Sequence, residues 1–365
     1  MTTNGHAPQK RVAILIEQKV EDSEFQIPYN ALKRAGAEVV VVGSRMNEEY
    51  KGKQGKVAIK PDATATESRP EAFDAVIIPG GMAPDSMRTN MKMVRFVSEA
   101  MHQGKLIAAI CHGPQVLIEG DLLKGKQATG FRAIRKDMHN AGAEVIDAPL
   151  AVDGNLITSR RPGDLPIFVT AILTRLGLTI PDTTLPAETD VDAGWWKLAE
   201  EWGGSTRMDI VNGINIAIGG EKYGLEAFDH YSDRTQDTEL KTVFEIIRAN
   251  KQQHIQRLEA RLSIFGERES FRASASSLLA NLKSVTQAVD DVSLLRYAIG
   301  DLQTGVVDTY RLRNTLTDPA TVAIFDDMEV TLAHDEQRLA DLYRARLDAS
   351  SIKPPNPTTS AAVSS

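Results

Sequence analysis

The sequence lacks the features that mark secreted and membrane-spanning proteins. It has one cysteine among 365 residues, which excludes a disulfide within the chain and gives no sign of an oxidising compartment. No apolar stretch approaches the roughly 18 residues of a membrane span. The N-terminal residues MTTNGHAPQKR also lack the apolar core of a signal peptide. We therefore expect a cytoplasmic protein with no membrane partner.

The sequence also has no excess of positive charge. The chain has 42 lysine and arginine residues against 49 acidic ones, which gives a formal net charge of −7. Nucleic-acid binding depends on clustered basic residues that neutralise phosphates, whereas basic residues here are mostly interleaved with acidic ones. We therefore expect no nucleic-acid partner. The chain of 365 residues, 42% of them hydrophobic, is too long for one ordinary hydrophobic core. We therefore expect two domains.

Strand and helix patterns alternate in the first half of the chain. Short apolar runs typical of buried parallel strands lie at residues 12–16, 38–42, 75–78 and 106–110, and helical patterns lie at 24–35 and 91–102. This alternation predicts an α/β domain with a doubly wound, flavodoxin-like parallel sheet and a site at the carboxyl ends of its strands. The Asp153-Gly154 pair predicts a small hairpin beside that sheet.

The second half shows helical periodicity and no strand signal. Apolar residues recur at steps of three and four in four segments, which begin near Val211, Leu240, Ser293 and Pro319. The pattern resembles an all-α, ferritin-like four-helix bundle with a long connection between its second and third helices. We expect a flexible N-terminus at 1–10, the α/β domain at 11–178, a linker at 179–192, the bundle at 193–348 and a disordered tail at 349–365.

The single cysteine, Cys111, lies between a predicted strand and a predicted helix. Gly113 and Pro114 break the strand, so the cysteine occupies a tight turn with the geometry of a nucleophile elbow. Helix amides and a polar partner can lower the pKa of a thiol from about 8.5 to about 5–6. We expect that shift here, with the sulfur facing outward. The plainer interpretation is a buried, inert cysteine.

Four motifs, in the right order, resemble those of the PfpI family of intracellular cysteine hydrolases, within the class I glutamine amidotransferase-like superfamily. They are VEDSEFQIPYNALKRAGAEV, DAVIIPGGMAPDSMRTN, AAICHGPQVL and NAGAEVIDAPLAVDGNLITSRRPGDL. The resemblance implies a thiolate that attacks the carbonyl of a peptide, a glycated adduct or a small dicarbonyl, without a cofactor. It also implies a homo-oligomer, either a dimer or a hexamer.

The resemblance also assigns roles to particular residues. Cys111 would be the nucleophile, His112 the base or proton shuttle, and Glu21 the buried carboxylate that hydrogen-bonds the sulfur. The backbone amides of Gly81 and His112 would bind an oxyanion. Asp85, where the family has glutamate, would reach the histidine of a neighbouring subunit. In the plainer alternatives Glu21 belongs to a solvated helix start, His112 caps a helix and Gly81 forms an ordinary turn.

The predicted bundle departs from a di-iron site, which needs a glutamate from each of two helices and a Glu-x-x-His from each of the others. The residues at the corresponding positions are Glu221, Lys251, His254, Gln303, Thr331 and His334. Lys251, Gln303 and Thr331 stand where carboxylates are needed, so we expect no metal. We expect Lys251 to pair with Glu221 instead. The plainer alternative is a polar seam.

Two functions of different classes fit this sequence. In the first, the protein is a cysteine-dependent hydrolase of the peptidase, deglycase or glyoxalase type. In the second, Cys111 is an oxidisable thiol of a non-catalytic redox or stress sensor, and the helical domain is an assembly or chaperone-like surface. Turnover that depends on Cys111 and Glu21 would distinguish the two.

Overall fold

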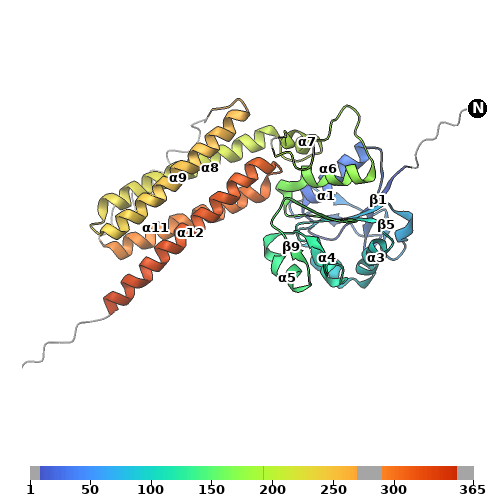
Figure 1. Cartoon of the computed structure of the whole chain (residues 1–365), viewed down its shortest axis with the longest axis horizontal. Helices are drawn as coiled ribbons and strands as arrows, with labels where there is room; N and C mark the ends of the chain where they lie inside the picture. Colours follow the sequence, from blue (N-terminus) through green and yellow to red (C-terminus); the bar gives the residue numbers. More distant parts are fainter. Residues whose placement is uncertain (1–8, 192, 269–289, 352–365) are drawn as a thin grey trace, which may run out of the picture. The chain divides into compact units, whose positions relative to one another are not determined.

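The computed structural model describes residues 9–191, 193–268 and 290–351, an α/β part followed by long helices (Figure 1). The chain divides into two compact units. The first contains the described residues up to Ile210 together with Arg313–Ala323. The second contains Val211–Leu312 and the described residues from Ile324 onward. Residues 1–8 of the predicted N-terminus at 1–10, residues 269–289 of the long connection, and residues 352–365 of the predicted tail at 349–365 lie outside the described residues.

The first unit is built around a seven-stranded sheet in the order β10-β11-β7-β6-β1-β2-β5. The strands are β1 (Arg11–Leu15), β2 (Glu38–Gly43), β5 (Ala63–Thr64), β6 (Ala75–Ile78), β7 (Leu106–Ile110), β10 (Leu150–Asp153) and β11 (Leu156–Ser159). All neighbours are parallel except β10, which pairs with β11 through the predicted Asp153-Gly154 hairpin. The predicted doubly wound sheet is confirmed. Short ladders join β3 (Tyr50–Lys51) to β4 (Ala58–Ile59) and β8 (Gln127–Ala128) to β9 (Glu144–Val145).

Helices cover both faces of the sheet, which is why its central strands are almost entirely apolar. α1 (Asp22–Arg34) and α6 (Leu165–Leu176) pack together on one face. α3 (Met91–His102) packs with α2 (Ala83–Thr89) and α4 (Pro114–Glu119) on the other (Figure 1). The remaining helical elements are α5 (Arg135–Asn140), η1 (Pro70–Ala72), η2 (Arg132–Ile134) and η3 (Pro162–Asp164).

The boundary between the domains differs from the predicted one. The helix α7 (Trp195–Glu201) was expected in the bundle, but Trp195, Leu198 and Trp202 are buried in the hydrophobic core of the first unit. Ile180, in the predicted linker, joins the same core. These apolar side chains pack with α6 and complete the first core, so the first unit extends to Ile210 rather than to 178.

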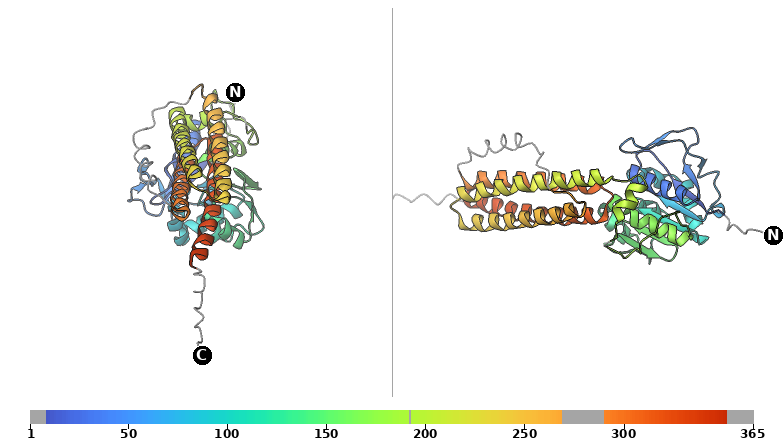
Figure 2. Two further views of the ribbon diagram at one scale, coloured as in Figure 1. Left: turned by 90° about the vertical axis from the view of Figure 1, so that its left-hand side faces the viewer. Right: turned by 90° about the horizontal axis from the view of Figure 1, so that it is seen from above.

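Four long helices lie side by side in the helical part (Figure 2). They are α8 (Arg207–Arg234), α9 (Thr238–Ile264), α11 (Asp291–Thr315) and α12 (Pro319–Ser351). Their predicted patterns are confirmed, and α12 continues three residues into the predicted tail. Phe228, Phe244, Leu295 and Leu302 are among the fully buried core side chains.

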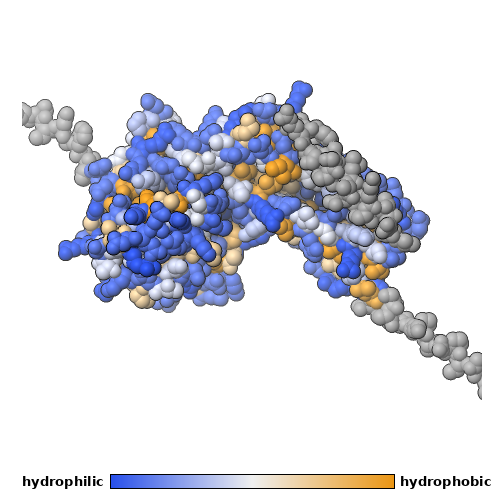
Figure 3. Space-filling model, turned by 180° about the vertical axis from the view of Figure 1, so that it is seen from behind, coloured by the Kyte–Doolittle hydropathy of each residue, from blue (hydrophilic) through white to orange (hydrophobic). Residues whose placement is uncertain are grey.

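The surface of the described residues is largely hydrophilic on the face that Figure 3 shows, with small groups of hydrophobic side chains. Within the described ranges, no helix is both long enough and apolar enough to cross a membrane.

Candidate active site around Cys111

Cys111 lies in the sharp turn that follows β7, as the nucleophile-elbow pattern predicts. Its φ of +60° is in the left-handed region that residues other than glycine rarely adopt. The Cys111 amide donates to the Ser159 carbonyl at 3.0 Å, and the Gly113 amide donates to the Ile110 carbonyl at 2.7 Å. A Cβ atom on Gly113 would lie 2.3 Å from the Ile78 oxygen, so only glycine fits there. The strained turn fixes the cysteine against the ends of β6 and β11.

The sulfur of Cys111 is enclosed rather than facing outward as predicted. The residue is 6% exposed, and polar groups from three segments contact it. His112 Nδ1 lies 3.3 Å from Sγ, and the Glu24 carboxyl and the Gly81 amide lie close enough to shift the pKa of the thiol. These contacts distinguish Cys111 from an inert cysteine packed among apolar side chains.

Glu24, and not Glu21, is the carboxyl group that contacts the sulfur. Glu24 is fully buried, and its Oε2 accepts the Gly80 amide at 2.7 Å. Glu21 instead contacts Lys53 Nζ at 3.5 Å and Gln54 Nε2 at 3.3 Å. Glu24 lies inside α1 on the helical stripe that includes buried Ile27 and Ala31, whereas Glu21 precedes the helix. The three- and seven-residue spacing to Ile27 and Ala31 was the sequence signal for this assignment.

The pKa values of Glu24 and of the Cys111 thiol are both raised. This contradicts our prediction that the thiol pKa would be lowered. Burial raises the pKa of Glu24 to about 8, and the nearby Glu21 carboxylate adds to the increase. Burial and then the Glu24 charge raise the pKa of the Cys111 thiol, which the Gly81 amide only partly offsets. The prediction considered the helix amides, which lower a thiol pKa. It did not consider complete burial beside a second acid, which raises it. The two groups therefore titrate as one coupled pair.

His112 is positioned to accept a proton from Cys111. Its ring stacks on Phe131 with the centroids 4.8 Å apart. Burial lowers the pKa of His112, and the Lys53 charge lowers it further, so the imidazole is neutral near pH 7. Because Nδ1 is the atom close to Sγ, it can take the thiol proton when the other nitrogen carries the hydrogen.

The two predicted oxyanion amides both border the nucleophile. Gly81 has a φ of +77°, and a Cβ there would lie 2.4 Å from the Glu21 nitrogen. A Cβ on the adjacent Gly80 would lie 2.8 Å from both the Cys111 Cβ and the His112 nitrogen. Because Gly80 and Gly81 have no side chains, their backbone can pack directly against Glu21 on one side and against Cys111 and His112 on the other. The Gly81 amide lies close enough to the sulfur to lower the thiol pKa, and the His112 amide is the other candidate oxyanion donor.

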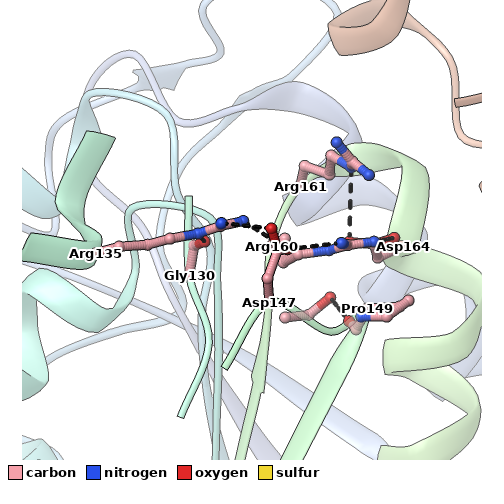
Figure 4. Close-up of polar contacts among 8 residues, drawn as sticks. Gly130, Arg135, Asp147, Pro149, Arg160, Arg161 and Asp164 are labelled. Atoms are coloured by element: carbon pink, nitrogen blue, oxygen red, sulfur yellow. Dashed lines mark hydrogen bonds and ion pairs between the residues drawn. The ribbon is translucent and has the colours of Figure 1, made fainter. Parts of the chain in front are cut away.

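A network of charged residues surrounds Arg160, which directly follows β11 (Figure 4). Asp147 accepts two hydrogen bonds from Arg135, at 2.7 and 2.8 Å, and one from Arg160 at 2.9 Å. Arg160 also donates to buried Asp164. Burial opposes ionisation of Asp147, but these two arginines outweigh it and lower its pKa to about 2. The sequence analysis missed this network, whose signal was the Arg160-to-Asp164 spacing in the SRRPGD motif.

In the bundle, the predicted pairing of Lys251 with Glu221 is confirmed. Lys251 Nζ lies 3.6 Å and His254 Nδ1 lies 3.1 Å from Glu221 Oε2, and all three side chains are at most 6% exposed. Burial tends to raise the pKa of Glu221, but Lys251 and His254 outweigh it and hold that pKa low.

The other predicted bundle positions do not face this cluster. Gln303 is exposed and bonds Glu336, His334 is exposed, and the Thr331 hydroxyl donates to a backbone carbonyl of its own helix. Asp301 and Asp335 face Lys251 instead, because α11 and α12 are rotated relative to the predicted register.

The two aspartates that take these positions have further partners, which include Arg338 at 3.2 Å from Asp335 Oδ1. Asp301 accepts from the Tyr231 hydroxyl at 2.7 Å, and Asp335 accepts from the Asn250 amide at 2.9 Å. Burial raises the pKa of both carboxyls, and Lys251 partly counters it. The lysine ammonium stands among the carboxylates where a di-metal centre would need its cations, so these residues do not fit one.

Known proteins resemble both parts of the chain. The first part matches the DJ-1/PfpI family over residues 10–175. It is 40% identical over 169 residues to "Protein/nucleic acid deglycase 2" of Escherichia coli (strain K12), a match covering 46% of this chain and 98% of that protein. It is 42% identical over 160 residues to "General stress protein 18" of Bacillus subtilis (strain 168), covering 44% of this chain and 93% of that protein.

One solved structure matches nearly the whole chain. It is a two-domain protein from Anabaena variabilis containing DJ-1/ThiJ/PfpI-like and ferritin-like domains. The two chains are 56% identical with a TM-score of 0.87, and the match covers 97% of this chain and 100% of the other. The predicted ferritin-like architecture of the helical part is therefore confirmed. Because the sequence motifs, the elbow around Cys111 and these relatives agree, the chain belongs to the DJ-1/PfpI family.

Proposed function

We propose that the protein is a cysteine-dependent hydrolase of the deglycase or glyoxalase type, in which the Cys111 thiolate attacks a carbonyl carbon. The observation that carries the proposal is the enclosure of one sulfur by the Glu24 carboxyl, the His112 ring and the Gly81 amide, on a strained turn. Strain of this kind persists where the surrounding structure fixes it, and it is common at active sites. The relative named as a deglycase supports the same reaction class.

The chemistry follows from the groups around the sulfur. The thiol proton passes to His112 Nδ1, because Glu24 is already protonated near pH 7, and Sγ bonds to the carbonyl carbon of the substrate. The carbonyl oxygen becomes an oxyanion that the His112 amide can stabilise. The oxyanion takes up the proton held by His112, which gives a hemithioacetal on Cys111. With a dicarbonyl substrate, His112 can then act as base and move the hydrogen from the carbon bearing sulfur to the adjacent carbonyl carbon, which gives a thioester. Water cleaves that thioester and releases a 2-hydroxy acid and the free thiol.

A substrate panel tests the proposal. Methylglyoxal, glycated N-acetyl amino acids and peptides are to be assayed with wild type and Cys111→Ser in parallel. Removal of a covalent nucleophile lowers turnover by at least about a thousandfold, and we expect that loss for the dicarbonyl or glycated substrates. Circular dichroism checks that the serine variant is folded. Reversible oxidation of Cys111 by peroxide, with no turnover of any substrate, would favour the redox-sensor alternative instead.

We further propose that Asp85 acts across an interface between two copies of this chain. It is exposed in the first turn of α2 and is therefore available to a neighbour. If its carboxylate orients a neighbouring His112, Asp85→Ala will lower turnover about tenfold without changing thermal unfolding. Ser86→Ala, on the same exposed turn, is the matched control. Full activity in a monomer demonstrated by sedimentation would contradict this role.

A further inference from the structure

The loop from Gly52 to Val57 is held against the candidate active site by a buried carboxylate. Asp22 is 1% exposed, and its two oxygens accept the backbone amides of Gln54 at 2.7 Å and Val57 at 2.8 Å. A Cβ on Gly52 would lie 2.0 Å from Asp22 Oδ1, so the backbone wraps closely around that side chain. The loop is thus ordered by groups that lie on α1 and do not depend on a ligand.

The loop presents Lys53 beside the site. The Lys53 amide donates to the Val20 carbonyl at 2.8 Å, which fixes its backbone next to Glu21. Its side chain is 55% exposed, and Nζ makes one contact of 3.5 Å with Glu21 Oε2. An ammonium has three donors, so it can bind another acceptor while keeping this contact. Glu21 also has Gln54 as a second partner, so it is not left alone if Lys53 turns toward a ligand.

The charge of Lys53 acts on the side chains that contact the nucleophile. Its positive charge acts to lower the pKa of each of three groups, Glu21, Glu24 and His112. At pH 7 Glu24 is protonated because its pKa is about 8, and His112 is neutral. An anionic ligand close to the sulfur would therefore meet an exposed cation without repulsion from either of these two side chains.

We propose that Lys53 binds a negatively charged group of the substrate, so that the site favours carbonyl compounds with a nearby carboxylate over neutral ones of the same size. This inference rests on the proposed function, because that function places the reacting carbonyl at Cys111. It adds a substrate class to the site: short 2-oxo acids and carboxylate-bearing glycated compounds. Glyoxylate and glyoxal are aldehydes of similar size, but only glyoxylate carries a carboxylate.

Alkylation of the only cysteine tests Lys53 without requiring turnover. Iodoacetate and iodoacetamide are nearly equal in size, but only iodoacetate carries a carboxylate. The two rate constants for Cys111 are to be measured by intact mass at pH 7.5, and their ratio divided by the ratio for N-acetylcysteine. We expect this normalised ratio to exceed one in wild type and to fall about fivefold in Lys53→Gln, the size expected for one exposed charge pair. It should also fall in 1 M NaCl, which screens that pair.

Two variants make the result specific. Lys53→Arg keeps the charge and should keep the wild-type ratio within about twofold, a difference below the effect of an exposed pair. Lys51→Gln removes a 66% exposed lysine from the preceding strand β3 and should leave the ratio unchanged. A ratio that is the same in wild type and Lys53→Gln, with normal iodoacetamide rates, would overturn the Lys53 proposal alone. Failure of both reagents to modify Cys111 would overturn the proposed function as well.

Discussion

Replacing Glu24 with leucine will slow alkylation of Cys111 by iodoacetamide about 10- to 100-fold at pH 8, the effect expected when a thiolate loses one hydrogen bond. The reason is that Cys111 and Glu24 are adjacent buried acids, so ionisation of one opposes ionisation of the other. When the pair loses its first proton, near the Glu24 pKa of about 8, the reactive form has the charge on sulfur and the proton on Glu24. Leucine cannot hold that proton or donate to the sulfur.

The pH profile gives a second readout of the same pair. In wild type the alkylation rate should rise through about pH 8 as the first proton leaves. Glu24→Gln keeps a neutral donor beside the sulfur but cannot ionise, so its profile should show a single thiol titration and a rate near that of wild type. Glu21→Gln is the matched control, because Glu21 contacts Lys53 rather than the sulfur. A larger loss in Glu21→Gln than in Glu24→Leu would show that the contact is assigned to the wrong carboxyl group.

Replacing Lys251 with methionine will destabilise the bundle by about 3–5 kcal/mol, because it removes the permanent positive charge beside buried Glu221 and leaves only the His254 ring as its partner. Asp301 and Asp335 also lose the positive charge that they face. Glu221→Met should cost less, since Lys251 still faces those two aspartates. The double replacement should be more stable than Lys251→Met alone, because Glu221 no longer remains as a buried charge.

Hydrogen exchange of peptides from α8 and α9, measured in the full chain, reports these losses locally. The tryptophans Trp195, Trp196 and Trp202 lie in the first unit, so their fluorescence shows whether that unit stays folded. Lys222→Met is the matched control, because Lys222 faces Glu259 at 3.9 Å on the surface and an exposed pair contributes at most about 1 kcal/mol. Strictly additive effects of Glu221→Met and Lys251→Met would show that the two side chains do not interact.

The sequence by itself determined the elements and the position of the nucleophile. The apolar runs of β1, β6 and β7 are local signals, and the Gly113-Pro114 break after β7 placed Cys111 on its turn. The long helices of the bundle follow from a periodicity that each segment carries alone. Local patterns suffice here because hydrogen bonds within a helix, and burial of a strand on both faces, constrain neighbouring residues directly.

Only the tertiary structure decided which polar side chains meet. Glu21 and Glu24 are both acids at the start of α1, and the rotation of that helix against the sheet selects Glu24 for the sulfur. The same rotation choice places Asp335 rather than His334 inside the bundle. Successive helical residues differ by about 100° in direction, so a polar residue beside an apolar stripe can face either way until packing fixes the rotation. Packing also sets the burial that raises, rather than lowers, the pKa of Cys111.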